Sequence, residues 1–289
     1  MRNSCCASQQ MSESLPTIER VNPQKVKELL QTAVLGRRGL YFREAGSTND
    51  IGKGLAARGA SEGMVIASET QTGGRGRIGR EWASPAGGLW FSVILRPTVH
   101  AGHAAKLSLL ASVAVAKTIS KLYGLKTDIK WPNDVLLNGK KVCGILTESE
   151  IRGQRIDFAV LGIGVNADFE VQALPMHLRQ LATTLRHQLE GRVQREILLS
   201  ELLKEIEFHY HVFEQQKFDV ILEDWRSLAS FLGSDMKVQT DGEIVHGLAF
   251  DINKDGALVL RLRDGTMRNI TSGDIVAISN EQHPEYVDE

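Results

Sequence analysis

Cysteine and net charge are both scarce in this chain, and each shortage excludes a class of protein. Among 289 residues the only cysteines are Cys5, Cys6 and Cys143, and no C-x-x-C spacing occurs. Three cysteines do not make a disulfide framework, so the sequence predicts a protein of the reducing cytoplasm. The formal net charge of −1 leaves no broad basic surface for duplex nucleic acid, so any positive patch must be local.

Long apolar runs are missing as well. The opening stretch MRNSCCASQQMSES has no apolar segment long enough for a signal peptide, and no later segment approaches a membrane span. We therefore expect residues 1–22 to be a disordered tail and the protein to have no membrane partner. The adjacent Cys5 and Cys6 could carry a lipid or act in redox chemistry, although a thiol-bearing flexible tail is the simpler interpretation.

The rest of the chain has the composition of a globular protein, with 42% hydrophobic and 24% charged residues. Pro23 opens the first expected helix, and Ser47 with Asp50 gives the capping-box pattern of a second. The expected helices cover 23–38, a segment from 47, 104–123 and parts of 177–226, and the expected strands cover 40–44, 64–69, 88–97 and parts of 128–166.

The last part of the chain changes character. After Gly233, short apolar runs alternate with Asp-Gly turns at the spacing of a small β-barrel. The sequence therefore predicts an α+β protein, with a mixed sheet and helices in residues 23–230 and a small β-barrel domain in residues 231–283.

The stretch GGRGRIGREW, residues 73–82 and called the arginine loop below, contains a G-x-G-x-x-G pattern. A dinucleotide-binding turn needs a helix directly after the glycines, but Pro85 and Gly87-Gly88 cannot sustain one. Glycines that admit phosphate to the backbone, together with the guanidinium groups of Arg75, Arg77 and Arg80, instead indicate an anion clamp. We expect a loop that is disordered when empty and closes over an anion; a solvated basic loop or an RNA-binding segment are the alternatives.

A second group of polar residues lies around the hairpin signal Asn138-Gly139. A two-residue turn there would place Asp134 opposite Cys143 and put Lys141 diagonally beside Asp134, roughly 7–8 Å away between backbones. A slip of one residue would bring Lys140 to that face instead, and a surface ion pair is the simpler alternative. Glycines inside or at the ends of nearby strands often mark close approach of a ligand, so one cleft is expected here. These are Gly144, Gly162 and Gly164.

Five motifs together resemble those of biotin protein ligases. They are STN at 47–49, QTGGRGRIGREW at 71–82, KWPND at 130–134, KVCGILTE at 141–148 and GIGVN at 162–166. The resemblance extends from about residue 40 to the end and implies a class II synthetase-like catalytic domain followed by an SH3-like barrel. Only 46 residues precede Ser47, too few for the winged helix-turn-helix of repressor members. The resemblance is therefore to the monofunctional type, and no DNA binding is expected.

The resemblance implies a two-step reaction. Biotin and ATP, with Mg²⁺, would give biotinyl-5′-AMP and pyrophosphate, and a lysine of a biotin carboxyl carrier domain would then take the biotin and release AMP. A homodimer is compatible with the family. A lipoate or octanoate ligase of the same superfamily is the alternative, although Gln71 and the arginine loop favour biotin.

The resemblance also implies residue roles. Biotin would contact Ser47, Thr48, Asn49, Gln71, Gly74, Arg75, Arg77, Gly144 and Gly164, whereas ATP or the adenylate would contact Arg75, Arg77, Arg80, Trp82, Lys130, Asn133, Lys141 and Asn166. Lys141, Arg77 and Asp134 would be catalytic, with Asp134 orienting or deprotonating the acceptor lysine. Ser47 could instead be only a helix cap. No ligands for the metal can be assigned, and Cys143 is expected to be a buried thiol facing the cleft.

Overall fold

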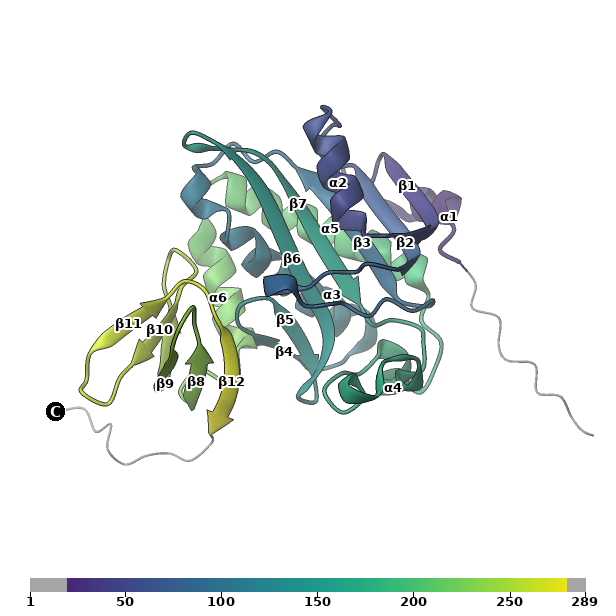
Figure 1. Cartoon of the computed structure of the whole chain (residues 1–289). Helices are drawn as coiled ribbons and strands as arrows, with labels where there is room; N and C mark the ends of the chain where they lie inside the picture. The colour runs from purple at the N-terminus through teal and green to yellow at the C-terminus, as the bar shows by residue number, and fades with distance from the viewer. Residues whose placement is uncertain (1–19, 280–289) are drawn as a thin grey trace, which may run out of the picture.

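The chain folds around two β-sheets (Figure 1). The structure is a computed structural model that describes residues 20–279. The larger sheet has seven strands in the order β1-β2-β3-β7-β6-β5-β4, and the smaller has five in the order β11-β10-β9-β8-β12. Only β1 and β2 pair in parallel; all other neighbours are antiparallel. The predicted fold class, a mixed sheet with helices followed by a small β unit, is confirmed.

The strands of the larger sheet are β1 (Gly39–Ala45), β2 (Val65–Gln71), β3 (Leu89–Leu95), β4 (Thr127–Lys130), β5 (Asp134–Leu137), β6 (Lys140–Arg152) and β7 (Arg155–Val165). Those of the smaller sheet are β8 (Asp235–Gln239), β9 (Ile244–Ile252), β10 (Leu258–Arg261), β11 (Met267–Ile270) and β12 (Asp274–Ser279). The helices are α1 (Pro23–Leu29), α2 (Thr48–Ala57), α3 (Lys106–Tyr123), α4 (Leu185–Leu189), α5 (Arg195–Glu214) and α6 (Phe218–Leu228).

Helices cover the two faces of the larger sheet unequally. The buried helix α3 packs on one face with α5 and α6 behind it, and the shorter α2 lies on the other (Figure 1). Side chains alternate accordingly along β7: Leu161 and Ile163 enter the main core, whereas Val160 packs beneath α2. The next two positions on the α2 face are Gly162 and Gly164, so β7 presents no side chains to the region where α2 begins.

The first helix is shorter than the predicted segment 23–38. Asn22 caps it by accepting the N–H of Gln24, but the helix ends at Leu29. Beyond the helix, the backbone N–H groups of residues 33–35 donate at 2.6–2.8 Å to the carboxylate of Glu207 on α5. A tertiary contact therefore replaces the helical hydrogen bonds that the apolar spacing predicted.

The β5–β6 hairpin has the predicted turn but not the predicted register throughout. Leu136 pairs with Lys141 as expected; a bulge then leaves Val142 as an extra residue, so Asp134 pairs with Gly144 and not with Cys143. Val142 and Cys143 both enter the main core, whereas Lys141 stays on the face of Asp134. The predicted pairing of Asp134 was wrong by one residue, while its predicted proximity to Lys141 is confirmed.

Polar contacts join the smaller sheet to the rest of the chain. Arg226 on α6 forms a 2.7 Å ion pair with Asp251 on β9, and the indole N–H of Trp131 donates to the carbonyl of Gly256 at 3.2 Å. The predicted domain limits at 230 and 231 remain predictions. Most of the predicted tail, including Cys5 and Cys6, lies outside the described residues; within 20–279 no helix is both long and apolar enough to cross a bilayer.

Candidate active site

A cleft of about 400 Å³ opens on the α2 face of the larger sheet. Its walls are the start of α2, the arginine loop, and the segment 174–182 that follows β7, and strands β6 and β7 form its floor. Its size is that of a pocket for a small organic ligand. The segments that build the cleft are far apart in the sequence, yet they carry four of the five motifs singled out above, and Asn133 and Asp134 bring in the fifth.

Glycines leave the strands at the floor of the cleft without side chains, so other groups can lie against the backbone. A Cβ at Gly164 would lie 2.5 Å from the indole nitrogen of Trp82, and one at Gly144 would lie 2.8 Å from the same ring. Trp82 therefore lies directly on the backbone of β6 and β7, where its buried Nε1 finds no hydrogen-bond partner among the described residues. A Cβ at Gly162 would lie 2.1 Å from Oδ1 of Asn49. The absence of a side chain at Gly162 therefore lets Asn49, and with it the start of α2, lie close to the sheet.

Carboxylates hold all three arginines of the arginine loop. Arg75 contacts Asp50 at 2.6 Å and Glu148 at 2.8 Å, and Arg80 contacts Asp274 of the smaller sheet at 2.7 Å. Arg77 lies 3.8 Å from the same Asp274 carboxylate. The loop takes one defined conformation in the structure, so its predicted mobility remains a prediction. Asp274 thus holds Arg77 and Arg80 on the side of the smaller sheet, as a clamp for a larger anion requires, whereas Asp50 and Glu148 hold Arg75 beside α2.

Arg77 also reaches the turn before β5. Its Nη1 donates to Oδ1 of Asn133 at 3.4 Å and to the carbonyl of Gly273 at 3.3 Å. Burial lowers the pKa of Arg77 below its ordinary value, and the nearby Asp274 and Asp134 oppose that effect. The group remains a cation, and its partial burial strengthens its interaction with any anion in the cleft.

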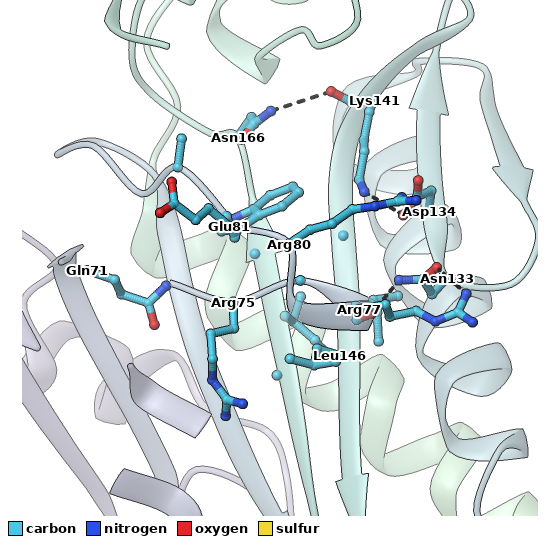
Figure 2. Close-up of a pocket in the computed structure, with 18 of the residues that line it drawn as sticks. Gln71, Arg75, Arg77, Arg80, Glu81, Asn133, Asp134, Lys141, Leu146 and Asn166 are labelled. Atoms are coloured by element: carbon cyan, nitrogen blue, oxygen red, sulfur yellow. Dashed lines mark hydrogen bonds and ion pairs between the residues drawn. The ribbon is translucent and has the colours of Figure 1, made fainter. Parts of the chain in front are cut away.

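Lys141 and Asp134 form an ion pair beside these arginines. Their side chains point toward each other from β6 and β5 at an Nζ–Oδ1 distance of 2.7 Å, without the alignment of a hydrogen bond (Figure 2). The ammonium also lies 5.0 Å from the centre of the Trp82 ring, within cation–π range. Lys140 is exposed, so the alternative register that would have used it is wrong.

The other end of the cleft is a buried polar network. Thr48 donates its backbone N–H to Oε1 of Gln71 at 2.9 Å, and Nε2 of Gln71 donates to Ser84 at 2.9 Å. Ser92 on β3 lies 2.8 Å from the Thr48 hydroxyl and 2.7 Å from Oδ1 of Asn49. Ser47 occupies the N-cap position of α2 but its side chain makes no capping hydrogen bond, so the predicted capping box is wrong; Ser47 lines the cleft.

Glu148 ties this network to the arginine loop. It accepts hydrogen bonds from Asn49 at 2.9 Å and Lys53 at 2.7 Å, in addition to that from Arg75. Burial alone would raise the pKa of Glu148, but the bonds from Lys53 and Asn49 and the charge of Arg75 outweigh burial and hold it below its ordinary value. A carboxylate thus fixes the relative position of α2, β6 and the loop.

Of the residues predicted for the site, all but Gly74 and Lys130 line the cleft. Asn166 is among them, and its amide donates to the carbonyl of Thr183 at 3.0 Å. Cys143 is buried as predicted, but its side chain lies in the main core and not in the cleft; burial raises the pKa of its thiol. That prediction of orientation fails because the bulge turns Cys143 away.

Sequence reasoning missed three residues. Glu148 ends a motif quoted above and could have been noticed there, whereas Ser92 lies in a strand whose apolar character hid it. Asp274 comes from the smaller sheet, and no local pattern connects it to the arginines. Within residues 20–279 no cluster of three or more His, Cys, Asp or Glu side chains could hold a metal ion.

Known proteins resemble this chain in both sequence and fold. Residues 41–166 match the model of the Biotin/lipoate A/B protein ligase family, and residues 231–277 match that of the Biotin protein ligase C terminal domain. The chain is similar to the bifunctional ligase/repressor BirA of Bacillus subtilis, with 35% identity over 257 residues that cover 89% of this chain and 79% of the relative. It is also similar to the biotin–[acetyl-CoA-carboxylase] ligase of Mycobacterium tuberculosis, with 34% identity over 270 residues that cover 89% of this chain and 97% of the relative.

Among solved structures, the biotin protein ligase from Aquifex aeolicus in complex with biotin and ATP superposes with a TM-score of 0.72. The sequence identity is 27%, and the superposition covers 83% of this chain and 97% of that one.

Proposed function

The chain belongs to the biotin protein ligase family, and we propose that it forms biotinyl-5′-AMP from biotin and ATP and transfers the biotin to a lysine of a biotin carboxyl carrier domain. The observation that carries this proposal is the Lys141–Asp134 pair, which lines the cleft within cation–π range of Trp82 and close to Arg77. The lipoate or octanoate alternative has less support, because the relatives described above are named as biotin ligases.

In the first step two anions must meet. An oxygen of the biotin carboxylate attacks the α-phosphorus of ATP, the bond from that phosphorus to the bridging oxygen breaks, and pyrophosphate leaves. Lys141 and Arg77 lie where they can offset the repulsion between carboxylate and phosphate and stabilise the charge of the transition state. The phosphates would replace the carboxylate of Asp274 on Arg80 and Arg77.

In the second step the amine of the carrier lysine attacks the carbonyl carbon of the mixed anhydride. The bond from that carbon to the phosphate oxygen breaks, AMP leaves, and the nitrogen loses a proton. We assign this proton to Asp134, because an ordinary lysine is neutral in only about one molecule in two thousand at pH 7. Until the carrier arrives, Trp82 and the arginine loop would cover the adenylate and exclude water.

Mg²⁺ would enter with ATP. Two carboxylates that line the cleft, those of Asp134 and Asp274, are paired with cations. We infer that the phosphates and water hold most of the coordination sphere, as is usual for this ion, and that the ion supplies neutralisation of the phosphate charge. The predicted cytoplasmic location follows from the carrier and from ATP as substrates.

Biotin-dependent exchange of labelled pyrophosphate into ATP tests the first step. The chain offers a matched pair of variants, since Lys140 and Lys141 are neighbours on β6 and only Lys141 faces the cleft. We expect exchange in the wild type, a loss of about 10²–10³-fold in Lys141→Ala, and less than a twofold change in Lys140→Ala. Absence of exchange in the wild type, or equal losses in both variants, would contradict the proposal.

A further inference from the structure

A buried ion pair lies behind the larger sheet, on the face opposite the cleft. Glu69 follows Val65 and Ala67 along one face of β2, and those two side chains belong to the main core. The carboxylate of Glu69 lies 2.8 Å from Nη1 of Arg195, and the two side chains are 10% and 4% exposed. The sheet therefore separates this pair from any ligand in the cleft.

Arg195 occupies a position where a helix disfavours a positive charge. It is the first residue of α5, a helix of 20 residues, and the free N–H groups at a helix N-terminus carry a partial positive charge. Burial adds a second cost, because a buried guanidinium needs a carboxylate beside it. An acidic residue would suit this helix end better, so the reason for the arginine lies outside α5.

Both members of the pair hold the turn that leads from the arginine loop into β3, residues 85–88, called the exit turn below. Oε1 of Glu69 accepts the backbone N–H of Gly87 at 3.1 Å, and Nη1 of Arg195 donates to the carbonyl of Gly88 at 2.7 Å. The carbonyl of Gly87 accepts the backbone N–H of Asp168 at 2.7 Å. Groups from β2, from α5 and from the segment after β7 thus meet at the two glycines.

Close packing fixes the exit turn as well. Gly87 has a φ of +93°, and a Cβ there would lie 2.5 Å from the carbonyl oxygen of Asp168. A Cβ at Gly88 would lie 1.8 Å from the ring of Trp90. The turn can therefore approach its neighbours only because it has no side chains, and its backbone has one position as long as the pair behind it is present.

The exit turn sets the position of Trp82 by two routes. Along the chain, four residues separate Trp82 from Gly87. Through space, the indole N–H of Trp90 donates to the carbonyl of Pro85 at 2.9 Å, and the rings of Trp90 and Trp82 meet edge to face with centroids 6.2 Å apart. Trp82 in turn lines the cleft beside Lys141. A displaced exit turn would therefore move the ring that covers the cleft.

We propose that Glu69 and Arg195 are positioning residues, which hold the exit turn from behind the sheet and thereby keep Trp82 and the arginine loop closed over the adenylate. The role rests on the proposed function, since an adenylate must form before it can be retained. Because the pair is remote from the cleft, its loss leaves the groups that act in the first step in place. The adenylate then forms at nearly the normal rate but is lost early.

The lifetime of the bound adenylate tests this role. The full-length protein is loaded with labelled biotin, ATP and Mg²⁺, freed of reagents, and followed as labelled biotinyl-adenylate leaves it. We expect Arg195→Met to lose the adenylate about tenfold faster than the wild type, because the exit turn loses a hydrogen bond from a charged donor. The rate of the adenylate-forming step should change by less than about threefold.

Glu207→Gln is the matched control for stability. Its carboxylate also accepts backbone N–H groups from a loop, at residues 33–35, and these residues do not line the cleft. This variant should lower Tm and leave the lifetime of the adenylate within about twofold of the wild type. An equally shortened lifetime in Glu207→Gln would overturn the proposal, because any loss of stability would then have the same effect.

A double variant separates position from stability. Glu69→Leu combined with Arg195→Met removes both buried charges, so Tm should be higher than in Arg195→Met alone. The exit turn still lacks both contacts, so the adenylate should be lost at least as fast as from Arg195→Met. A lifetime that recovers together with Tm, or a wild-type lifetime in either variant, would overturn the proposal. A wild type that forms no adenylate would instead contradict the proposed function.

Discussion

Adding one methyl group to the floor of the cleft, by Gly162→Ala, should damage stability and biotin binding together. The new Cβ would lie 2.1 Å from Oδ1, 2.8 Å from Cγ and 3.0 Å from Nδ2 of Asn49, so the side chain of Asn49 must move by about 1 Å to restore ordinary contact. That movement stretches the 2.7 Å bond from Ser92 and the 2.9 Å bond to Glu148. No penalty for a left-handed backbone applies, because φ of Gly162 is not positive.

The magnitude follows from these contacts. Overpacking of a core site costs about 1–3 kcal/mol and each weakened buried hydrogen bond about 1 kcal/mol, against a gain of about 0.4–1 kcal/mol from a less flexible unfolded chain. The free energy of unfolding should therefore fall by about 2–4 kcal/mol. At about 2–4 °C per kcal/mol for a chain of this size, Tm should drop by roughly 4–16 °C.

Calorimetry and a biotin titration of adenylate formation measure the two effects. Gly54→Ala is the control, since Gly54 lies on the same helix as Asn49 and a Cβ there has no neighbour closer than 3.7 Å. It should raise the free energy of unfolding by about 0.5–1 kcal/mol and leave KM for biotin unchanged. An unchanged Tm and KM in Gly162→Ala would refute the reasoning about the glycine floor.

Three further changes test other parts of the site. Asp134→Asn should slow transfer to the carrier lysine by about 10²-fold or more and adenylate formation by less than tenfold. If single-turnover measurements find equal losses in the two steps, Asp134 is not the base and only its ion pair with Lys141 remains. Asp274→Asn should lower KM for ATP about two- to fivefold, because a competing carboxylate leaves Arg80, and a higher KM would contradict this competition. The pKa of Glu148 is lowered in the folded protein, so its contribution to stability is present above about pH 4.5 and is lost as pH falls through the folded pKa. Urea unfolding should therefore find Glu148→Gln less stable than the wild type at pH 7, and the difference in the free energy of unfolding should narrow below pH 4. A difference that stays constant with pH would argue against this linkage.

The sequence pattern predicted those features of the β5–β6 hairpin that depend on neighbouring residues alone. The Asn138-Gly139 turn and the pairing of Leu136 with Lys141 followed from hairpin geometry, and so did the closeness of Lys141 to Asp134. The bulge at Val142 had no signal of its own, because a bulge serves the packing of the core beneath it. The orientation of the neighbouring thiol could not be predicted for the same reason.

Contacts between distant segments explain the remaining differences. The segment after Leu29 has helical apolar spacing, but Glu207, far along the chain, supplies acceptors that make another conformation favourable. Asp274 reaches the arginine loop from the smaller sheet across almost two hundred positions of sequence. Ser92 is one polar residue in a strand of apolar ones, and its importance follows only from its position beside Thr48.

The most direct test of the central claim weighs what the protein retains after one reaction. Purified protein would be incubated with ATP, Mg²⁺ and an equimolar mixture of biotin and lipoate, with no carrier domain, and examined by native mass spectrometry. We expect a retained biotinyl-adenylate, because the relatives named above are biotin ligases and the closed arginine loop would exclude water from the product. A retained lipoyl-adenylate, or no adenylate at all, would contradict it.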